Sequence, residues 1–199
     1  MTTEATQSRN VAILIFDDVE VLDFCGPFEV FSVANRDAVP TAFNVYTVAK
    51  STTVIARGGL VVSRHSSLEQ NPAPDILLIP GGVGTRRLLE NTVVLEWITH
   101  HAARSQLVTS VCTGALLLGR CGVLDKLEAT THHCCIDELQ AIAPRSCIQK
   151  DRRYVDAGGV ITSAGISAGI DMSLHIVRRF LGETHALKVA TYMEYKWNE

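Results

Sequence analysis

The sequence predicts an α/β fold in which helices cover both faces of a mainly parallel β-sheet. Three observations predict it. Short continuous apolar runs such as Val11–Phe16 recur along the chain, and such runs are typical of strands that are buried on both faces. Segments with a helical pattern separate these runs. The chain has 199 residues, 47% of them apolar and 20% charged, which suits one globular unit.

The N-terminal third alternates strand and helix. Val11–Phe16 is rich in β-branched residues and predicts the first strand. Gly26-Pro27 marks the start of a helix over Phe28–Ala34, because proline is tolerated in the first turn of a helix. Phe43–Val48 predicts the second strand. A hairpin is then expected, in which Arg57-Gly58-Gly59 joins Val54–Ala56 to Leu60–Ser63.

The middle of the chain predicts two further buried strands. Asp75–Pro80 is the first of them and stops at a pair of glycines. Helices are expected over Thr85–Glu90 and Val94–Ala103. Gln106–Val111 predicts the other strand, which leads directly into a helix over Ala115–Arg120. Strands and helices that alternate in this way form βαβ units, so these strands are expected to run parallel.

The C-terminal third predicts short elements followed by two long helices. Ala129–Thr131 is expected to be a short strand before a helix around Ile136–Ile142. The remaining expected elements are a hairpin split by Gly158-Gly159, with strands Tyr154–Ala157 and Val160–Ser163, and helices Gly169–Leu181 and Glu183–Trp197. The chain has no internal repeat and no linker-like segment. Residues 10–199 are therefore expected to form a single domain, with residues 1–9 as a flexible tail.

Charge and cysteine content restrict the class of partner. The formal net charge is −3, so no basic face for nucleic acid is predicted. No apolar run reaches the roughly 18 residues of a membrane span. The polar start and the short first apolar run do not resemble a signal peptide. The six cysteines form no C-x-x-C pair, which favours a reducing compartment, the cytoplasm.

Cys112 is the strongest candidate for a catalytic residue. It stands in Ser110-Val111-Cys112-Thr113-Gly114, where a strand ends and a helix begins. A nucleophile at such an elbow projects from a sharp turn, and the free N–H groups and dipole of the helix start are expected to lower the pKa of its thiol. The alternative is a buried structural cysteine.

Asp23 is the candidate acid. It lies between apolar residues in Val21-Leu22-Asp23-Phe24-Cys25, after the first strand. Partial burial there is expected to raise the pKa of the carboxyl and to let it donate a proton. The alternative is an N-cap for the helix that starts near Gly26-Pro27.

The glycine turn after Asp75–Pro80 is a candidate binding element. Pro80-Gly81-Gly82-Val83-Gly84 lacks the Lys-Ser/Thr ending of a P-loop and the third glycine of a dinucleotide fingerprint. Its backbone is expected to approach a small ligand closely, with N–H groups near Gly82 forming half of an oxyanion-type hole. A plain tight turn is the alternative.

Two further segments follow strands and could line a pocket. His132-His133-Cys134-Cys135 has metal-ligating residue types, but adjacent side chains are expected to point in different directions, so no metal is predicted. His132 could orient a substrate or be a core histidine. Gly165 and Ile166 belong to a small-residue loop, Ser163–Gly169, which either walls the pocket or serves packing.

These residues together resemble the ThiJ/PfpI superfamily. The resemblance rests on Val11–Phe31 (VAILIFDDVEVLDFCGPFEVF), on DILLIPGG and VTSVCTGALLLG, on the ATTHH stretch, and on SAGISAGIDMSL. It covers nearly the whole chain. Within the superfamily the segments are similar to the isonitrile (isocyanide) hydratase branch and to the ligand-sensing half of certain AraC-type regulators.

The resemblance implies a flavodoxin-like three-layer sandwich, a class I glutamine amidotransferase-like domain that is usually a homodimer. It places the family's nucleophile on Cys112, its acidic partner on Asp23, a further functional position on Thr113 and its glycine turn on Gly81-Gly82. The peptidase-like branch has a histidine after the cysteine, so Thr113 argues against a Cys-His hydrolase. His133 stands where the hydratase branch often has an aromatic residue.

The implied activity is hydration of an isonitrile to an N-substituted formamide through a thioimidate, with no metal or organic cofactor. Cys112 would attack the terminal carbon, and Asp23 would supply the proton. Two alternatives remain. One is a non-catalytic sensor of a small molecule or of redox state. The other is action on reactive carbonyls, which is weaker because such members usually carry Glu and His at the site.

Overall fold

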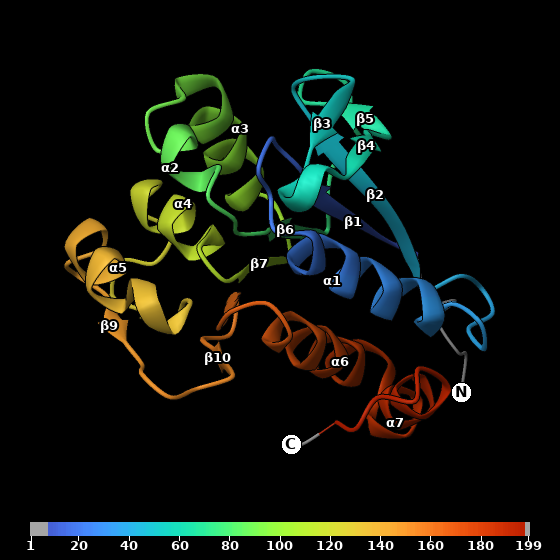
Figure 1. The fold of residues 1–199 in the computed structure, drawn as a ribbon. Helices are drawn as coiled ribbons and strands as arrows, with labels where there is room; N and C mark the ends of the chain where they lie inside the picture. Colours follow the sequence, from blue (N-terminus) through green and yellow to red (C-terminus); the bar gives the residue numbers. More distant parts are fainter. Residues whose placement is uncertain (1–7, 198–199) are drawn as a thin grey trace.

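The computed structural model describes residues 8–197 and has a seven-stranded sheet at its centre (Figure 1). The strand order is β10-β11-β7-β6-β1-β2-β5, and only β10 runs antiparallel to its neighbour. The strands are β1 (Arg9–Leu14), β2 (Phe43–Ala49), β5 (Ser66–Ser67), β6 (Ile76–Ile79), β7 (Leu107–Val111), β10 (Tyr154–Asp156) and β11 (Val160–Ser163). The predicted mainly parallel sheet is confirmed.

Two small sheets lie apart from the main one. β3 (Thr53–Ile55) and β4 (Val61–Ser63) form the predicted antiparallel hairpin around a 3₁₀ turn, η1 (Arg57–Gly59). β8 (Glu128–Ala129) pairs in parallel with β9 (Cys147–Ile148). The sequence predicts neither β5 nor β9, because two residues cannot show a periodicity.

Helices cover both faces of the main sheet, as predicted (Figure 1). One layer contains α1, α6 and α7, which pack against one another, and the other contains α2 to α5. The helices are α1 (Val21–Ala34), α2 (Thr85–Leu88), α3 (Thr92–Ala102), α4 (Gly114–Arg120), α5 (Ile136–Ile142), α6 (Ala168–Leu181) and α7 (Glu183–Tyr192), and a second 3₁₀ turn, η2 (His133–Cys135), precedes α5. Within residues 8–197, no helix is long and apolar enough to cross a membrane.

The hydrophobic core centres on the three middle strands. β1, β6 and β7 pair side by side, with Val11 opposite Ile76 and Ile76 opposite Leu107. From Val11 onward their side chains are buried on both faces of the sheet, which is why each strand reads as an unbroken apolar run. Each buried Leu or Ile contributes about 1.5–3 kcal/mol of transfer free energy. This rigid centre fixes the loops at the carboxyl ends of the strands.

The first helix begins earlier than predicted. α1 starts at Val21 and has Pro27 inside it, whereas the sequence predicts a start at Phe28. Proline removes one N–H donor from the helix interior. The helix continues across it because it buries Phe24, Val30 and Phe31 in the core. The early start places Asp23 in the first turn of the helix, facing inward.

The two ends of the chain also differ from expectation. Residues 1–7 of the predicted tail lie outside the described residues, and Arg9 already belongs to β1, paired with Phe43. α7 ends at Tyr192 instead of Trp197, because Glu194 adopts a left-handed φ of 50° and the Tyr195 N–H donates back to the carbonyl of Ala190.

Candidate active site

Cys112 occupies a sharp turn between β7 and α4. Its φ is 55°, in the left-handed region that a non-glycine residue rarely adopts. Its N–H lies 3.2 Å from the carbonyl oxygens of both Ser163 and Ala164, at the end of the neighbouring strand β11. Such a conformation costs about 1–3 kcal/mol and persists only where the surroundings impose it. The geometry is that of the predicted elbow.

Close packing beneath the turn imposes this conformation. A Cβ on Gly114 would lie 2.0 Å from the carbonyl oxygen of Ile79, so only glycine lets α4 start here. The Thr131 hydroxyl donates to the Cys112 carbonyl at 2.8 Å. Thr131 follows β8 and is buried. The sequence does not indicate that Thr131 belongs to the site, except that Thr131 directly precedes the candidate residue His132.

Asp23 is completely buried beside the elbow. Its Oδ2 accepts a hydrogen bond from the N–H of Gly81 at 3.0 Å, whereas its Oδ1 is buried without a hydrogen-bond partner. Burial raises the pKa of the carboxyl to about 7, against the lowering effect of the Gly81 N–H. The expected rise in pKa is confirmed. The capping alternative is wrong, because α1 has begun at Val21 and the carboxyl contacts another loop.

The Cys112 thiol does not have the lowered pKa that the sequence predicts. Burial raises the pKa to about 12, and the neighbouring charge of Asp23 adds to the rise. The N–H groups of Thr113 and Ile166 face the sulfur and lower the pKa by less. The prediction counted the donors at the helix start but not the loss of solvent, which here is the larger effect. Cys112 is therefore a protonated thiol beside a carboxyl that titrates near neutrality.

The glycine turn and Thr113 hold each other in place. Gly82 N–H donates to the Thr113 hydroxyl at 2.9 Å, and that hydroxyl lies 3.1 Å from the Gly82 carbonyl oxygen. The hydroxyl of Thr85, another residue that sequence reasoning missed, lies 2.8 Å from the same carbonyl. Because the N–H groups of Gly81 and Gly82 already have partners, the expected oxyanion role does not fit them. The donors that face the sulfur are the N–H groups of Thr113 and Ile166.

The loop after β11 completes the site. Ile166 has a φ of 53°, and its N–H faces both the Asp23 carboxyl and the Cys112 sulfur. A β-branched residue in this conformation is strained, which is common at functional sites. A Cβ on Gly165 would lie 2.2 Å from Cδ2 of His132, so the loop and the histidine ring are in close contact. Burial lowers the pKa of His132.

A cavity of about 570 Å³ opens beside this loop. Its wall includes Thr131, His132, Gly165 and Ile166, so it adjoins the elbow through both loops that touch Cys112. Basic and acidic side chains share the rest of the wall, namely Lys150, Arg152, Arg153, Asp137 and Asp151. Cys112 itself is 6% exposed. The cavity is therefore polar and lies next to the elbow, although Cys112 and Asp23 do not themselves line it.

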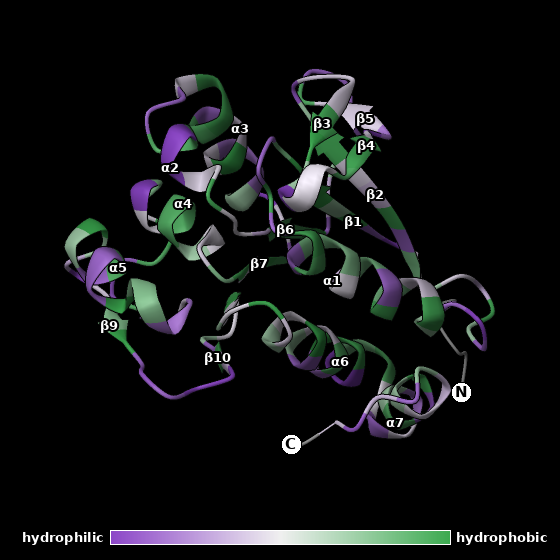
Figure 2. Ribbon diagram, viewed as in Figure 1, coloured by the Kyte–Doolittle hydropathy of each residue, from purple (hydrophilic) through white to green (hydrophobic). Residues whose placement is uncertain are grey.

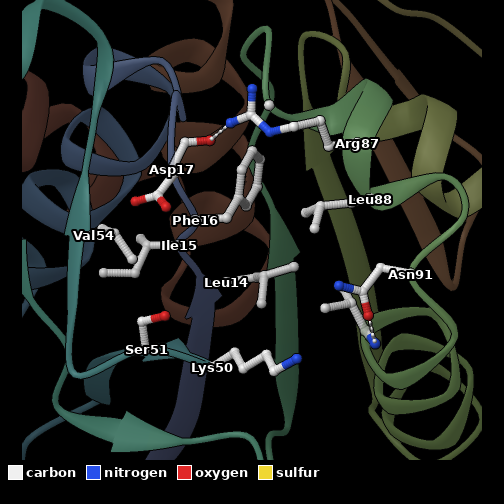
Figure 3. Close-up of a pocket in the computed structure, with 12 residues that line it drawn as sticks. Leu14, Ile15, Phe16, Asp17, Lys50, Ser51, Val54, Arg87, Leu88 and Asn91 are labelled. Carbon is white, nitrogen blue, oxygen red and sulfur yellow. Dashed lines mark hydrogen bonds between the residues drawn. The ribbon is translucent and has the colours of Figure 1, made fainter.

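A smaller cavity of about 220 Å³ lies at the carboxyl ends of β1 and β2 (Figure 3). Leu14, Phe16 and Leu88 give it an apolar floor. The Arg87 guanidinium closes one side by donating to the Asp17 carbonyl at 3.0 Å and to the Asp18 carboxylate at 2.8 Å. Neither Cys112 nor Asp23 lines it. Neither residue lines the larger cavity either, but that cavity is walled by Thr131 and Ile166, which contact Cys112, and the smaller cavity is not.

Sequence comparison finds an isonitrile hydratase and transcriptional regulators among the relatives of this chain. Residues 9–179 match the DJ-1/PfpI family. An isonitrile hydratase of Pseudomonas putida is 34% identical over 185 residues, which are 93% of this chain and 78% of the hydratase. The HTH-type transcriptional regulator GbdR of Pseudomonas aeruginosa is 26% identical over 204 residues, covering 98% of this chain and 55% of the regulator. The chain thus spans about half the length of that regulator.

Solved structures show the same fold. A ThiJ/PfpI family protein from Pseudomonas syringae superposes with a TM-score of 0.87 at 29% identity, covering 98% of this chain and 78% of the other. Drosophila melanogaster DJ-1beta gives a TM-score of 0.83 at 18% identity, covering 96% of this chain and all of the other. With the match over residues 9–179, these findings establish that the chain belongs to the DJ-1/PfpI family.

Proposed function

We propose that the protein hydrates an isonitrile, R–N≡C, to an N-substituted formamide, with Cys112 as the nucleophile. The observation that carries the proposal is the pairing of a strained, nearly buried thiol with a fully buried carboxyl whose pKa is raised to about 7. The 34% identity to an isonitrile hydratase supports the substrate class. Cys112 and Asp23 carry the chemistry, Thr113 positions the turn beside them, and no metal or organic cofactor takes part in the reaction.

In the first half of the reaction the thiol adds to the terminal carbon of the isonitrile. Because burial keeps the Cys112 thiol protonated, its proton passes to the Asp23 carboxylate as the sulfur attacks. Asp23 then delivers that proton to the carbon, which gives a thioimidate, Cys–S–CH=N–R. The N–H groups of Thr113 and Ile166 stabilise negative charge on the sulfur during the transfer.

In the second half water hydrolyses the thioimidate. Asp23, now ionised, takes one proton from the attacking water and passes it to the nitrogen, which gives Cys–S–CH(OH)–NH–R. The C–S bond then breaks, the hydroxyl proton returns to Asp23, and H–CO–NH–R is released. The sum is R–N≡C plus H₂O, with the thiol and carboxyl pair regenerated. Thr113 acts as a positioning residue, because its hydroxyl fixes the Gly82 turn against the elbow.

The direct test is formamide production from cyclohexyl isocyanide. We expect turnover by the wild type and, for Cys112→Ala, a loss of at least a thousandfold, since no covalent intermediate can form. Cys147→Ser is the matched control, because Cys147 is exposed and remote in sequence from the elbow. Equal turnover by Cys112→Ala and the wild type would eliminate the covalent mechanism.

A sensor of small molecules is the second candidate function. It is supported by the regulators that the chain resembles over 98% of its length. The high pKa of Cys112 argues against the redox version, because the thiolate is the form that peroxide oxidises. A panel of isonitriles without turnover, combined with saturable binding of a metabolite in the larger cavity, would favour the sensor.

We infer that two copies of the chain associate. The β3–β4 hairpin exposes Ile55, Leu60 and Val61, with 57%, 46% and 64% of their surface accessible, although all three are large apolar residues. Figure 2 shows this hairpin as an apolar (green) region at the edge of the molecule. Contiguous exposed apolar surface commonly marks an interface. A second copy is the occupant that the family resemblance implies.

A further inference from the structure

Three consecutive side chains outside the proposed mechanism converge on one point. Donor atoms of His132, His133 and Cys134 all lie within 4.8 Å of one another. In residues 8–197 they are the one such group of three His, Cys, Asp or Glu side chains. The sequence predicts that adjacent side chains diverge here, and that prediction is wrong. His132 is extended, with ψ 135°, and the chain then turns into η2, which brings the next two side chains back beside it.

The backbone sets the tautomer of the His132 ring. The Cys134 N–H donates to Nδ1 of His132 at 3.2 Å, so Nδ1 carries the lone pair of the neutral ring and Nε2 carries its proton. The ring is held on one side by the backbone at Gly165, where a Cβ would lie 3.0 Å from Nε2. The His132 and His133 rings lie 4.4 Å apart between centroids, with 30° between their planes. Metal binding would exchange this long hydrogen bond for a bond from Nδ1 to the cation, while the Nε2 N–H stays on the Gly165 side.

The cluster also has access and a fourth donor. His133 and Cys134 are exposed, and all three side chains line the cavity of about 570 Å³. Asp137, on the first turn of α5, lines the same cavity and could supply a carboxylate, or water could complete the set. Nearby Lys150 and Arg152 reduce the attraction for a cation. Arg86 is neutralised by Glu138 in a salt bridge.

We propose that His132, His133 and Cys134 form a binding site for a divalent cation of the zinc type. Two imidazoles and one thiolate suit Zn²⁺ and Co²⁺, whereas Mg²⁺ and Ca²⁺ prefer oxygen. On binding, the Cys134 thiol releases its proton to solvent as the sulfur–metal bond forms. The site is independent of the hydration chemistry, since it uses neither Cys112 nor Asp23. With three protein ligands and an open position facing the cavity, it resembles an exchangeable site more than a closed structural one.

Cobalt provides the test, because bound thiolate gives a charge-transfer absorption and four-coordinate Co²⁺ gives visible d–d bands. We expect both when Co²⁺ is added to the reduced full chain, with loss of both when Zn²⁺ displaces it. Cys134→Ser should remove the charge-transfer band, and His133→Ala should weaken Co²⁺ binding at least tenfold. Both side chains are exposed, so circular dichroism should show an unchanged fold.

Three control variants separate this site from other donors. Cys147→Ser removes another exposed thiol, and His100→Ala disrupts another adjacent histidine pair, with ring centroids 5.0 Å apart and no cysteine beside it. Cys112→Ser removes the proposed nucleophile. All three should bind Co²⁺ as the wild type does. A charge-transfer band that survives in Cys134→Ser, or disappears in Cys112→Ser, overturns the proposal, as does a wild type that gives no band.

Discussion

At the scale of single residues, the site depends on a proton that two buried groups share. The Cys112 thiol and the Asp23 carboxyl influence each other's pKa, and burial raises both values. Between about pH 7 and pH 12 the pair holds one proton. That one-proton form is the reactive one, because it contains both the nucleophile and the group that accepts its proton. The pair thus resembles a thiol with a built-in base more than a free thiolate.

The first prediction concerns the pH dependence of turnover. Below the Asp23 pKa of about 7 both groups are protonated, so Asp23 cannot accept the thiol proton. We expect kcat/KM for cyclohexyl isocyanide to rise about tenfold per pH unit up to pH 7 and then to level off. Asp23→Asn should lower kcat by roughly 10²–10⁴ and abolish this rise. A flat profile for the wild type between pH 5 and pH 9 contradicts the shared-proton mechanism.

The second prediction concerns the pH dependence of stability. The pKa of Asp23 is raised on folding, so the folded state binds the proton more tightly than the unfolded state. The resulting stability is complete below the unfolded pKa of about 4 and is lost as the pH rises through about 7. Asp23→Asn has no such dependence. Its Tm minus that of the wild type should be higher at pH 8 than at pH 5, by roughly 5 °C.

Thermal melts at both pH values decide this second prediction. A Tm difference that is independent of pH would mean that the Asp23 carboxyl titrates as it does in the unfolded chain. The same melts verify that Asp23→Asn is folded, which makes the loss of turnover in the first prediction interpretable.

At the scale of elements, three loops from distant parts of the sequence are pressed together around the elbow. The turn after β6 meets the start of α4, and a Cβ at Gly81 would lie 2.5 Å from the backbone nitrogen of Thr113 and 2.8 Å from Oδ2 of Asp23. The loop after β11 and the segment after β8 close the other sides. The site geometry is therefore a product of loop packing, with each loop fixed by a buried strand.

The third prediction follows from that close contact. Gly81→Ala should push the turn away from Thr113, lower the free energy of unfolding by about 1–3 kcal/mol and reduce formamide production at least tenfold. Gly159→Ala is the matched control, because a Cβ there would meet nothing within 4 Å. The measurements are chemical denaturation and the formamide assay. Wild-type values for both in Gly81→Ala would contradict the packing argument.

The sequence predicts an element well where the element is buried on both faces and its residues therefore form a continuous apolar run. β1, β6 and β7 are buried on both faces, so their apolar runs predict them to within two residues. The start of α1 is missed because Pro27 looks like a first-turn proline, and tertiary packing overrides that preference. Elements of two residues, such as β9, carry no pattern at all.

For the candidate site, too, the sequence predicts some features and not others. Cys112 and Asp23 are marked by residue type and by their positions near strand ends. The partner of each N–H group could not be predicted, because Gly81 and Gly82 find theirs across 58 and 31 residues of sequence. The pKa of Cys112 depends on burial by several loops, which a local pattern does not contain. Likewise, the turn that gathers His132 to Cys134 is a feature of the backbone.

At the scale of the whole molecule, neither the core nor the candidate site explains why the β3–β4 hairpin exposes apolar side chains. Ile55 and Val61 are directly opposite each other on β3 and β4, and both side chains are exposed. The hairpin is tied to the residues before α1, since the Asp18 N–H donates to the Ile55 carbonyl at 2.8 Å. An interface on the hairpin would therefore be linked to the segment that leads to Asp23.

The fourth prediction tests whether this surface joins two copies. We expect the wild type to sediment at twice the mass of one chain, and Val61→Asp to sediment as a single chain, because a charge at the centre of an apolar interface is strongly unfavourable. Val39→Asp is the matched control, since Val39 is 97% exposed and lies elsewhere on the surface. A wild type that sediments as one chain at micromolar concentration rejects the association.

The two left-handed residues at the site, Cys112 and Ile166, have an implication for protein engineering. Glycine would relax either position at no steric cost, so a library selected only for heat resistance is expected to accumulate Ile166→Gly. A protein with this substitution would have a higher Tm, but the N–H of residue 166 would be held less rigidly against the Cys112 sulfur. Selection for thermal stability should therefore favour glycine at position 166, whereas selection for formamide production should favour isoleucine. A screen that alternates between the two selections should retain isoleucine.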